Sequence, residues 1–138
     1  MIREVDEATP DVVEALERLV PQLSRSAGRP DLDGVLADNG VRLLVAEDDS
    51  GTIVGTLSLV LFHTPSGVHA QIEDVVVDAA ARGLGLGRKL TVEALRLARE
   101  VGARQVDLTS RPSREAANAL YRSLGFVERE TNVYRYEL

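Results

Sequence analysis

The sequence has no cysteine and only two histidines, His63 and His69, among its 138 residues. Without cysteine there are no disulfides, no thiolate metal ligands and no covalent intermediate on a cysteine sulfur. Two histidines are too few for a histidine-based metal centre unless carboxylates complete the ligand set. We therefore expect no bound metal.

Long apolar runs are absent as well. No run approaches the roughly 20 residues that a membrane-spanning helix needs, and residues 1–4 do not form an apolar signal segment. The net charge of −6 disfavours nucleic acid as a partner, because such binding depends on neutralising phosphates. We expect one domain over residues 1–138, located in the cytoplasm, without membrane or nucleic-acid partners.

A glycine-rich stretch in the middle of the chain indicates a strand, a loop and then a helix. Residues 72–77 end in three valines and predict a strand. An apolar stripe at helical spacing begins at Leu86 and continues through Leu90 and Leu97. The loop between them alternates glycine and leucine: Gly83, Leu84, Gly85, Leu86 and Gly87.

The place of these glycines favours phosphate binding. A helix start exposes unpaired backbone N–H groups at the positive end of the helix dipole, and residues without side chains let a phosphate approach those groups. Three basic residues flank the loop: Arg82, Arg88 and Lys89. We interpret the loop as a polyphosphate site.

The spacing of the loop excludes two common polyphosphate motifs. A Walker A loop ends in Gly-Lys-Ser/Thr, but Gly87 is followed by Arg88 and Lys89, so no hydroxyl is placed for magnesium. The dinucleotide fingerprint needs a glycine three residues after Gly85, where this chain has Arg88.

The run from Arg82 to Gly87 resembles the pyrophosphate loop of the GNAT acetyltransferase superfamily, written Arg/Gln-x-x-Gly-x-Gly/Ala. The resemblance implies acetyl-CoA as co-substrate, with its pantetheine arm paired to the end of the preceding strand. The coenzyme-binding residues that it implies are Val75, Val76, Val77, Arg82, Gly83, Leu84, Gly85, Leu86, Gly87 and Arg88.

A second motif supports the same superfamily. The run from Asn118 through Tyr121 to Gly125 and Phe126 is similar to a GNAT pattern in which the asparagine contacts the coenzyme arm and the tyrosine lies near its sulfur. Asn118 and Tyr121 are three residues apart, so they are neighbours on one face of a helix. The resemblance therefore implies that both side chains bind coenzyme.

Acetyl transfer to an amine needs a base for the ammonium proton, a donor for the carbonyl oxygen and an acid for the departing thiolate. We predict Tyr121 as the acid, because an unperturbed phenol pKa near 10 roughly matches an alkyl thiolate. For the base we predict Glu73, acting through water, which the resemblance also supports. Asp74 is the alternative, because a bulge in the strand would exchange the faces of these two residues. Asp107 remains a further alternative.

The predicted fold is α+β, with a mixed, mostly antiparallel sheet flanked by helices in the order β-α-α-β-β-β-α-β-α-β-β. The helical crossover after the fourth strand makes the fifth parallel to it, and we expect this pair to splay and open a cleft. The expected strands are residues 2–5, 41–47, 52–62, 68–77, 104–109, 126–128 and 132–137.

The acceptor is not fixed by the sequence. A small-molecule amine is the principal prediction, and a peptide amine stays open. Residues 72–77 are most similar to glucosamine 6-phosphate N-acetyltransferases, which makes an amino-sugar phosphate an alternative. Its phosphate would contact arginines chosen from Arg25, Arg29, Arg111 and Arg114. A non-catalytic acetyl-CoA sensor is a third hypothesis. A homodimer through the last strands and a monomer both remain open.

Overall fold

The computed structural model of the protein describes residues 1–24 and 28–138. The chain divides into two compact units, Met1–Leu108 and Thr109–Leu138. The first unit contains the sheet, and the second contains helix α4 (Glu115–Ser123) and the C-terminal segment.

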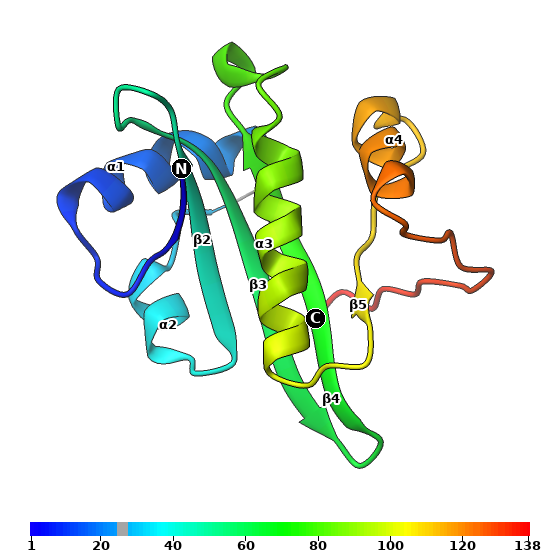
Figure 1. The fold of residues 1–138 in the computed structure, drawn as a ribbon. Coiled ribbons are helices and arrows are strands. Elements are labelled where there is room, and N and C mark those ends of the chain that lie inside the picture. The colour runs from blue at the N-terminus through cyan, green and yellow to red at the C-terminus, as the bar shows by residue number, and fades with distance from the viewer. Residues whose placement is uncertain (25–27) are drawn as a thin grey trace. The chain divides into compact units, whose positions relative to one another are not determined.

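The sheet of the first unit has five strands that lie side by side in chain order (Figure 1). They are β1 (Ile2–Glu4), β2 (Val41–Glu47), β3 (Ile53–Thr64), β4 (Gly67–Val77) and β5 (Val106–Asp107). The first four pair antiparallel, and β5 pairs parallel with β4. The predicted mixed sheet with a parallel fourth and fifth strand is confirmed.

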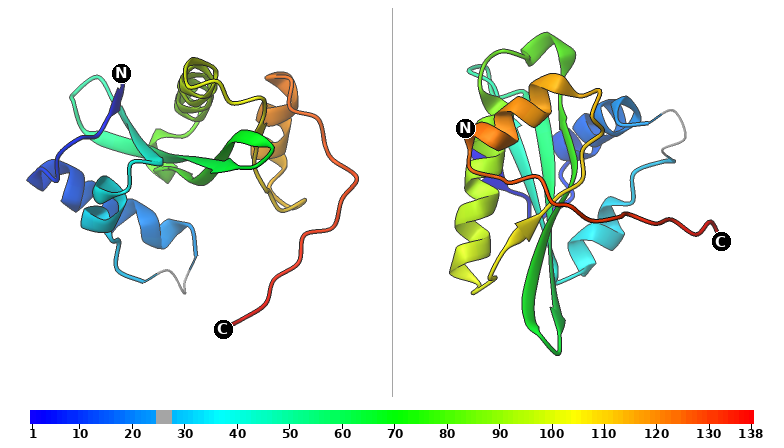
Figure 2. Two further views of the ribbon diagram at one scale, coloured as in Figure 1. Left: turned by 90° about the horizontal axis from the view of Figure 1, so that it is seen from below. Right: turned by 90° about the vertical axis from the view of Figure 1, so that its right-hand side faces the viewer.

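Helices cover both faces of this sheet (Figure 2). Helices α1 (Pro10–Leu19) and α2 (Leu32–Ala37) lie on one face, and α3 (Leu86–Glu100) lies on the other. Two short 3₁₀ turns, η1 (Val20–Gln22) and η2 (Ala79–Ala81), follow α1 and β4. No helix in the described residues is long and apolar enough to cross a membrane.

The hydrophobic core beneath α1 explains why that helix forms. Its side chains Val12, Leu16 and Leu19 are buried and recur at helical spacing, so they fall on one stripe. They cluster with inward-facing strand residues, among them Val45 and Val76. On the opposite face, α3 comes so close that a Cβ at Gly55 would lie 3.3 Å from Leu90 Cδ1.

A β-bulge interrupts the ladder between β3 and β4. Ser58 pairs with Glu73 and Thr56 pairs with Val76, so one residue of β3 between these pairs lies opposite two of β4. Asp74 takes up the extra residue with a φ of 51°, which only a few non-glycine side chains tolerate, aspartate among them. The bulge that the sequence left open is therefore present, and it changes which β4 side chains share a face.

The last two predicted strands are wrong. Residues 126–138 contain neither strand nor helix, and Val133, Tyr134 and Tyr136 are exposed. Residues 132–137 contain valine and tyrosine, which favour strands, but a strand needs a neighbour to pair with. Within residues 109–138, all of which the structure describes, no other strand exists to supply that neighbour. The fifth strand is also shorter than predicted, two residues in place of six.

Candidate active site

The glycine loop connects β4 to α3 through a short turn. Gly83 and Gly85 have φ values of 85° and 74°, in the left-handed region that glycine adopts without strain. A Cβ added at either position would meet nothing within 4 Å. These glycines are therefore required by backbone conformation, and the space beside the loop is open.

The start of α3 presents backbone donors to that open space. Gly85 is the N-cap residue, and the Lys89 N–H donates to the Gly85 carbonyl oxygen at 3.1 Å. The N–H groups of Leu86 and Gly87 come before this bond and have no carbonyl four residues back within the helix. Gly85 has no side chain that could accept from them. This helix end is therefore suited to receive an anion.

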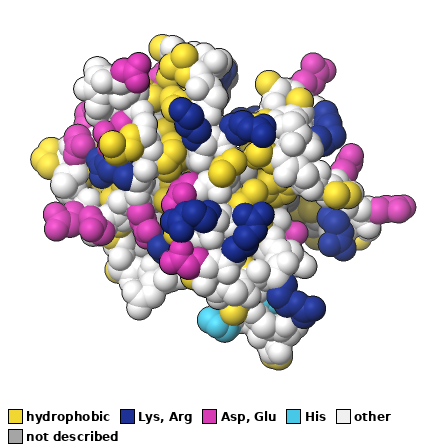
Figure 3. Space-filling model, in the orientation of Figure 1, with side chains coloured by type: hydrophobic (Ala, Val, Ile, Leu, Met, Phe, Trp, Pro, Cys, Tyr) yellow, Lys and Arg dark blue, Asp and Glu magenta, His cyan; other side chains and the backbone are white. Residues whose placement is uncertain are grey.

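Positive charge surrounds the same helix end. Arg82, Arg88 and Lys89 are all exposed, and Lys and Arg side chains gather over the start of α3 (Figure 3). Leu86 is buried and holds the loop to the core, with 6% of its surface exposed, whereas Leu84 is 62% exposed. The alternating leucines thus have different roles, since only Leu86 belongs to the core.

The bulge sets the positions of the predicted residues at the end of β4. Val76 pairs opposite Thr56 and is buried in the cluster with α1, whereas Val75 has no partner in β3. Glu73 pairs opposite Ser58, two residues from Thr56, so its side chain lies on the same face as that of Val76. The structure thus places Glu73 on the α1 side of the sheet.

Glu73 and Asp107 lie on one face of the parallel strand pair. The β4–β5 ladder joins Ala70 to Val106 and Gln71 to Asp107, and β4 continues beyond it to Val77. Gln71 donates from Nε2 to Glu73 Oε1 at 2.6 Å. Paired residues in a ladder share a face, so the Asp107 carboxylate and the Glu73 carboxylate flank Gln71. Both are exposed.

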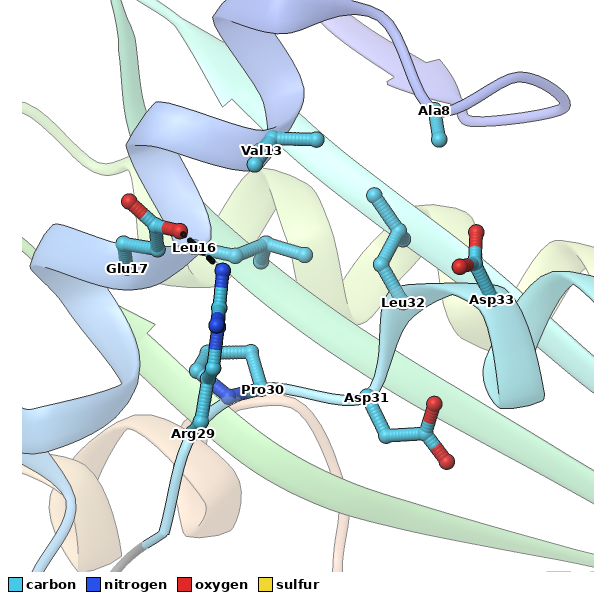
Figure 4. Close-up of a pocket in the computed structure, with 9 residues that line it drawn as sticks. All are labelled: Ala8, Val13, Leu16, Glu17, Arg29, Pro30, Asp31, Leu32 and Asp33. Atoms are coloured by element: carbon cyan, nitrogen blue, oxygen red, sulfur yellow. Dashed lines mark ion pairs between the residues drawn. The ribbon is translucent and has the colours of Figure 1, made fainter.

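Arg29, one of the predicted phosphate contacts, borders a cavity of about 220 Å³ (Figure 4). The cavity lies between α1 and the segment that leads into α2. Arg29 Nη2 lies 3.8 Å from Glu17 Oε1 across it, so the charge of this arginine is matched by a carboxylate. Arg25, the other arginine predicted here, is outside the described residues.

The second unit holds the other predicted pair on α4. Asn118 Nδ2 donates to the Arg111 carbonyl oxygen at 3.0 Å and so fixes the turn before the helix. Tyr121 is buried, with 9% of its surface exposed. Burial raises the Tyr121 pKa above its ordinary value of 10.0, and the nearby Arg114 charge opposes that shift. The assumption of an unperturbed phenol is therefore wrong.

The end of α4 explains the Tyr-x-x-x-Gly-Phe spacing. Gly125 has a φ of 99°, and its N–H donates to the Arg122 carbonyl oxygen. The Phe126 N–H donates to the Tyr121 carbonyl oxygen at 3.0 Å. These two bonds form a Schellman cap, in which the residue after the glycine packs back on the third residue from the helix end. Phe126 does so, since its ring lies 5.6 Å from the Tyr121 ring.

Known proteins identify the family of this chain. The profile of the acetyltransferase (GNAT) family matches residues 9–126. The chain belongs to this family. The resemblance seen in the glycine loop and in the Asn118 motif is thereby confirmed, and so is the α+β fold.

Two relatives and one solved structure show which acetyltransferases the chain is similar to. "Probable glucosamine 6-phosphate N-acetyltransferase 2" of rice is 37% identical over 107 residues, 73% of this chain and 62% of the relative. A mycothiol acetyltransferase of Amycolatopsis mediterranei is 48% identical over 59 residues, 43% of this chain and 20% of the relative. An acetyltransferase structure from Trypanosoma brucei has a TM-score of 0.78 at 26% identity, covering 100% of this chain and 99% of that one. The chain thus spans less than two thirds of the length of these two relatives.

The structure also contains an ion pair that sequence reasoning missed. Arg18 on α1 binds the carboxylate of Asp78, which follows β4 directly. The two residues are 60 positions apart, and neither belongs to a motif. The only local signal is that Asp78 lies in the turn before the glycine loop, where an acidic residue can cap the following N–H groups.

Proposed function

We propose that the protein is an acetyl-CoA-dependent N-acetyltransferase that moves acetyl to a primary amine by direct attack in a ternary complex. One observation carries the proposal: the left-handed glycines lead into a helix start whose first N–H groups have no partner within the helix, and three exposed cations flank it. Membership of the GNAT family supports the reading of this helix end as the seat of the coenzyme diphosphate.

In this proposal the coenzyme lies along β4. Its diphosphate accepts hydrogen bonds from the backbone at the start of α3, and Arg82 and Arg88 neutralise its charge. Its pantetheine arm pairs with the backbone of Val75 to Val77 as an added strand would, because β4 extends beyond the short β4–β5 ladder. Asn118 contacts the same arm.

The proposed chemistry follows from the three demands of acetyl transfer. Glu73, through a water molecule, takes the proton of the attacking ammonium, and the freed nitrogen bonds to the thioester carbon. A backbone N–H near Val75 or Val76 donates to the carbonyl oxygen as it becomes negative. The C–S bond then breaks, and the coenzyme sulfur takes the proton of the Tyr121 phenol. The nitrogen loses its second proton as the amide forms, and this proton restores the phenol by way of water.

The raised pKa of Tyr121 keeps the phenol protonated but makes it a weaker acid than the sequence predicts. A phenol with a pKa above 10.0 stays protonated through the physiological range, so the proton is in place when the thiolate leaves. The bulge at Asp74 supports the role of the backbone donor, since an unpaired strand residue such as Val75 leaves ladder groups for a ligand.

An amino-sugar phosphate is the second candidate for the acceptor. The rice relative whose name contains glucosamine 6-phosphate aligns with 73% of this chain. Asp107, on the same face as Glu73, would hold the amine, and an arginine such as Arg111 would contact the phosphate. The name of the mycothiol relative points to a different acceptor, so a small-molecule amine remains the broader proposal.

An amine panel tests the proposal. Each amine, with D-glucosamine 6-phosphate among them, is incubated with acetyl-CoA, and the free thiol released is followed against a no-acceptor control. Thermal stability with coenzyme A is measured in parallel, because a ligand that binds only the folded state raises the melting temperature. We expect stabilisation and amine-dependent thiol release. Stabilisation without release for any amine favours a sensor, and no stabilisation removes the coenzyme site.

A further inference from the structure

The guanidinium of Arg18 joins three elements of the first unit. Its Nη1 donates to Asp78 Oδ2 at 2.7 Å, and its Nη2 donates to the Ile53 carbonyl oxygen at 2.8 Å. Its Nε donates to Glu14 one turn earlier, at 3.4 Å. The planar fork of arginine can make these bonds together, which a lysine ammonium on a flexible stem cannot reproduce. Arg18 therefore ties the end of α1 to the start of β3 and the end of β4.

Asp78 is the first residue of the turn that leads into the glycine loop. Its N–H donates to the Val54 carbonyl oxygen at 2.7 Å, which fixes its backbone to β3. Its carbonyl oxygen accepts from the Ala81 N–H at 2.9 Å, and Oδ1 accepts from the Ala80 N–H at 3.4 Å. One carboxylate oxygen thus caps the turn while the other binds Arg18.

We propose that Arg18 is a positioning residue for the coenzyme loop. The inference rests on the proposed function, and it assigns to α1 a role in holding the loop that carries Arg82 and Gly83. Only η2 separates Asp78 from Arg82, and Ala81 in that turn is 6% exposed. By holding the Asp78 carboxylate, Arg18 therefore also holds the short, hydrogen-bonded turn that follows it. That turn in turn positions the backbone proposed to bind phosphate.

The Arg18–Asp78 ion pair should matter more to the arrangement of the loop than to the stability of the whole fold. The side chains of Arg18 and Asp78 are 33% and 24% exposed, and ion pairs that reach solvent contribute little to overall stability. The same pair matters more to a loop, because a ligand binds only the fraction of molecules in which the loop is arranged. If loss of the pair lowers that fraction to about a tenth, the apparent dissociation constant rises about tenfold.

The test is calorimetric titration of coenzyme A into the full chain and its variants. Arg18→Gln removes the donor, and Asp78→Asn removes the charge while its amide oxygen can still cap Ala80. We expect each to raise the coenzyme A dissociation constant about tenfold. The double variant should match the single variants, because all three lose one shared interaction. Arg18→Lys should fall between wild type and Arg18→Gln.

A matched control removes a comparable ion pair elsewhere. Arg42 donates to Glu4 at 2.7 Å between β2 and β1, with side chains 28% and 38% exposed. Arg42→Gln should lower the melting temperature about as much as Arg18→Gln but leave coenzyme affinity unchanged. The KM for acetyl-CoA should rise in Arg18→Gln, with kcat at saturation nearly kept.

Two results overturn the inference. One is wild-type affinity for coenzyme A in Arg18→Gln and Asp78→Asn, measured well below their melting temperatures. The other is a double variant whose dissociation constant for coenzyme A rises by the product of the two single-variant increases. If wild-type protein itself does not bind coenzyme A, the proposed function fails, which is a distinct outcome.

Discussion

Gly83 and Gly51 have nearly the same positive φ, 85° and 83°. A Cβ at either position would meet nothing within 4 Å. Gly83 lies in the loop before α3, and Gly51 lies in the turn between β2 and β3. Substitution by alanine therefore places a side chain in the left-handed region at both positions, but only Gly83 lies in the loop proposed to bind phosphate.

This pair gives the first prediction. Gly83→Ala and Gly51→Ala should each lower the free energy of unfolding by about 1 kcal/mol, the usual cost of an L-residue in the left-handed region. Only Gly83→Ala should weaken coenzyme A binding, by about tenfold or 1.4 kcal/mol, as titration calorimetry would record. Equal coenzyme affinity in the two variants would argue that the loop does not hold the phosphates.

Tyr121→Phe tests the proposed acid. The variant keeps the ring and its edge contact with Phe126, so the fold should be preserved while the proton is lost. We expect kcat to fall about 10²-fold, with the KM for acetyl-CoA changing less. A kcat within twofold of wild type would exclude Tyr121 from the reaction.

The raised pKa of Tyr121 also predicts how stability depends on pH. The folded state binds the phenolic proton more tightly than the unfolded state, whose pKa is near 10.0. The stabilisation is therefore complete below pH 10 and is lost as pH rises through the higher folded pKa. Denaturant unfolding at several alkaline pH values should show a steeper loss for wild type than for Tyr121→Phe. Parallel curves would contradict the burial of the phenol.

Two substitutions at the bulge distinguish Glu73 from Asp74 as the base. Glu73→Gln should lower kcat about 10²-fold. Asp74→Gly removes the other carboxylate but suits the positive φ of that position, so it should keep the bulge and most of the activity. The reverse pattern would make Asp74 the base.

Direct attack predicts a kinetic pattern. With acetyl-CoA and an accepted amine both varied, double-reciprocal plots should intersect, because both substrates must be bound before the acetyl group moves. Parallel lines would indicate a covalent acetyl-enzyme, for which the chain has no cysteine.

Local sequence signals predicted the parts of the site that depend on local conformation. The alternation of Gly83, Leu84 and Gly85 before an apolar stripe was sufficient to predict a strand-to-helix turn, since positive φ and helical periodicity are encoded by neighbouring residues. The Schellman cap could have been found in the same way, because Gly125 followed by an aromatic residue is its usual signature.

Contacts between residues far apart in the chain could not be predicted from local sequence patterns. Arg18 and Asp78 meet only because α1 packs beside the start of β3 and the end of β4. No local sequence pattern predicts that packing. The raised Tyr121 pKa follows from burial, and burial is a property of the folded chain. The two predicted C-terminal strands are absent, because residue types that favour strands do not say whether a partner strand is present.

The most direct measurement is a crystal structure of the protein with coenzyme A. The account predicts the diphosphate against the backbone N–H groups at the start of α3, with Arg82 and Arg88 beside it. Density for the coenzyme elsewhere, with that helix end empty, would contradict the account.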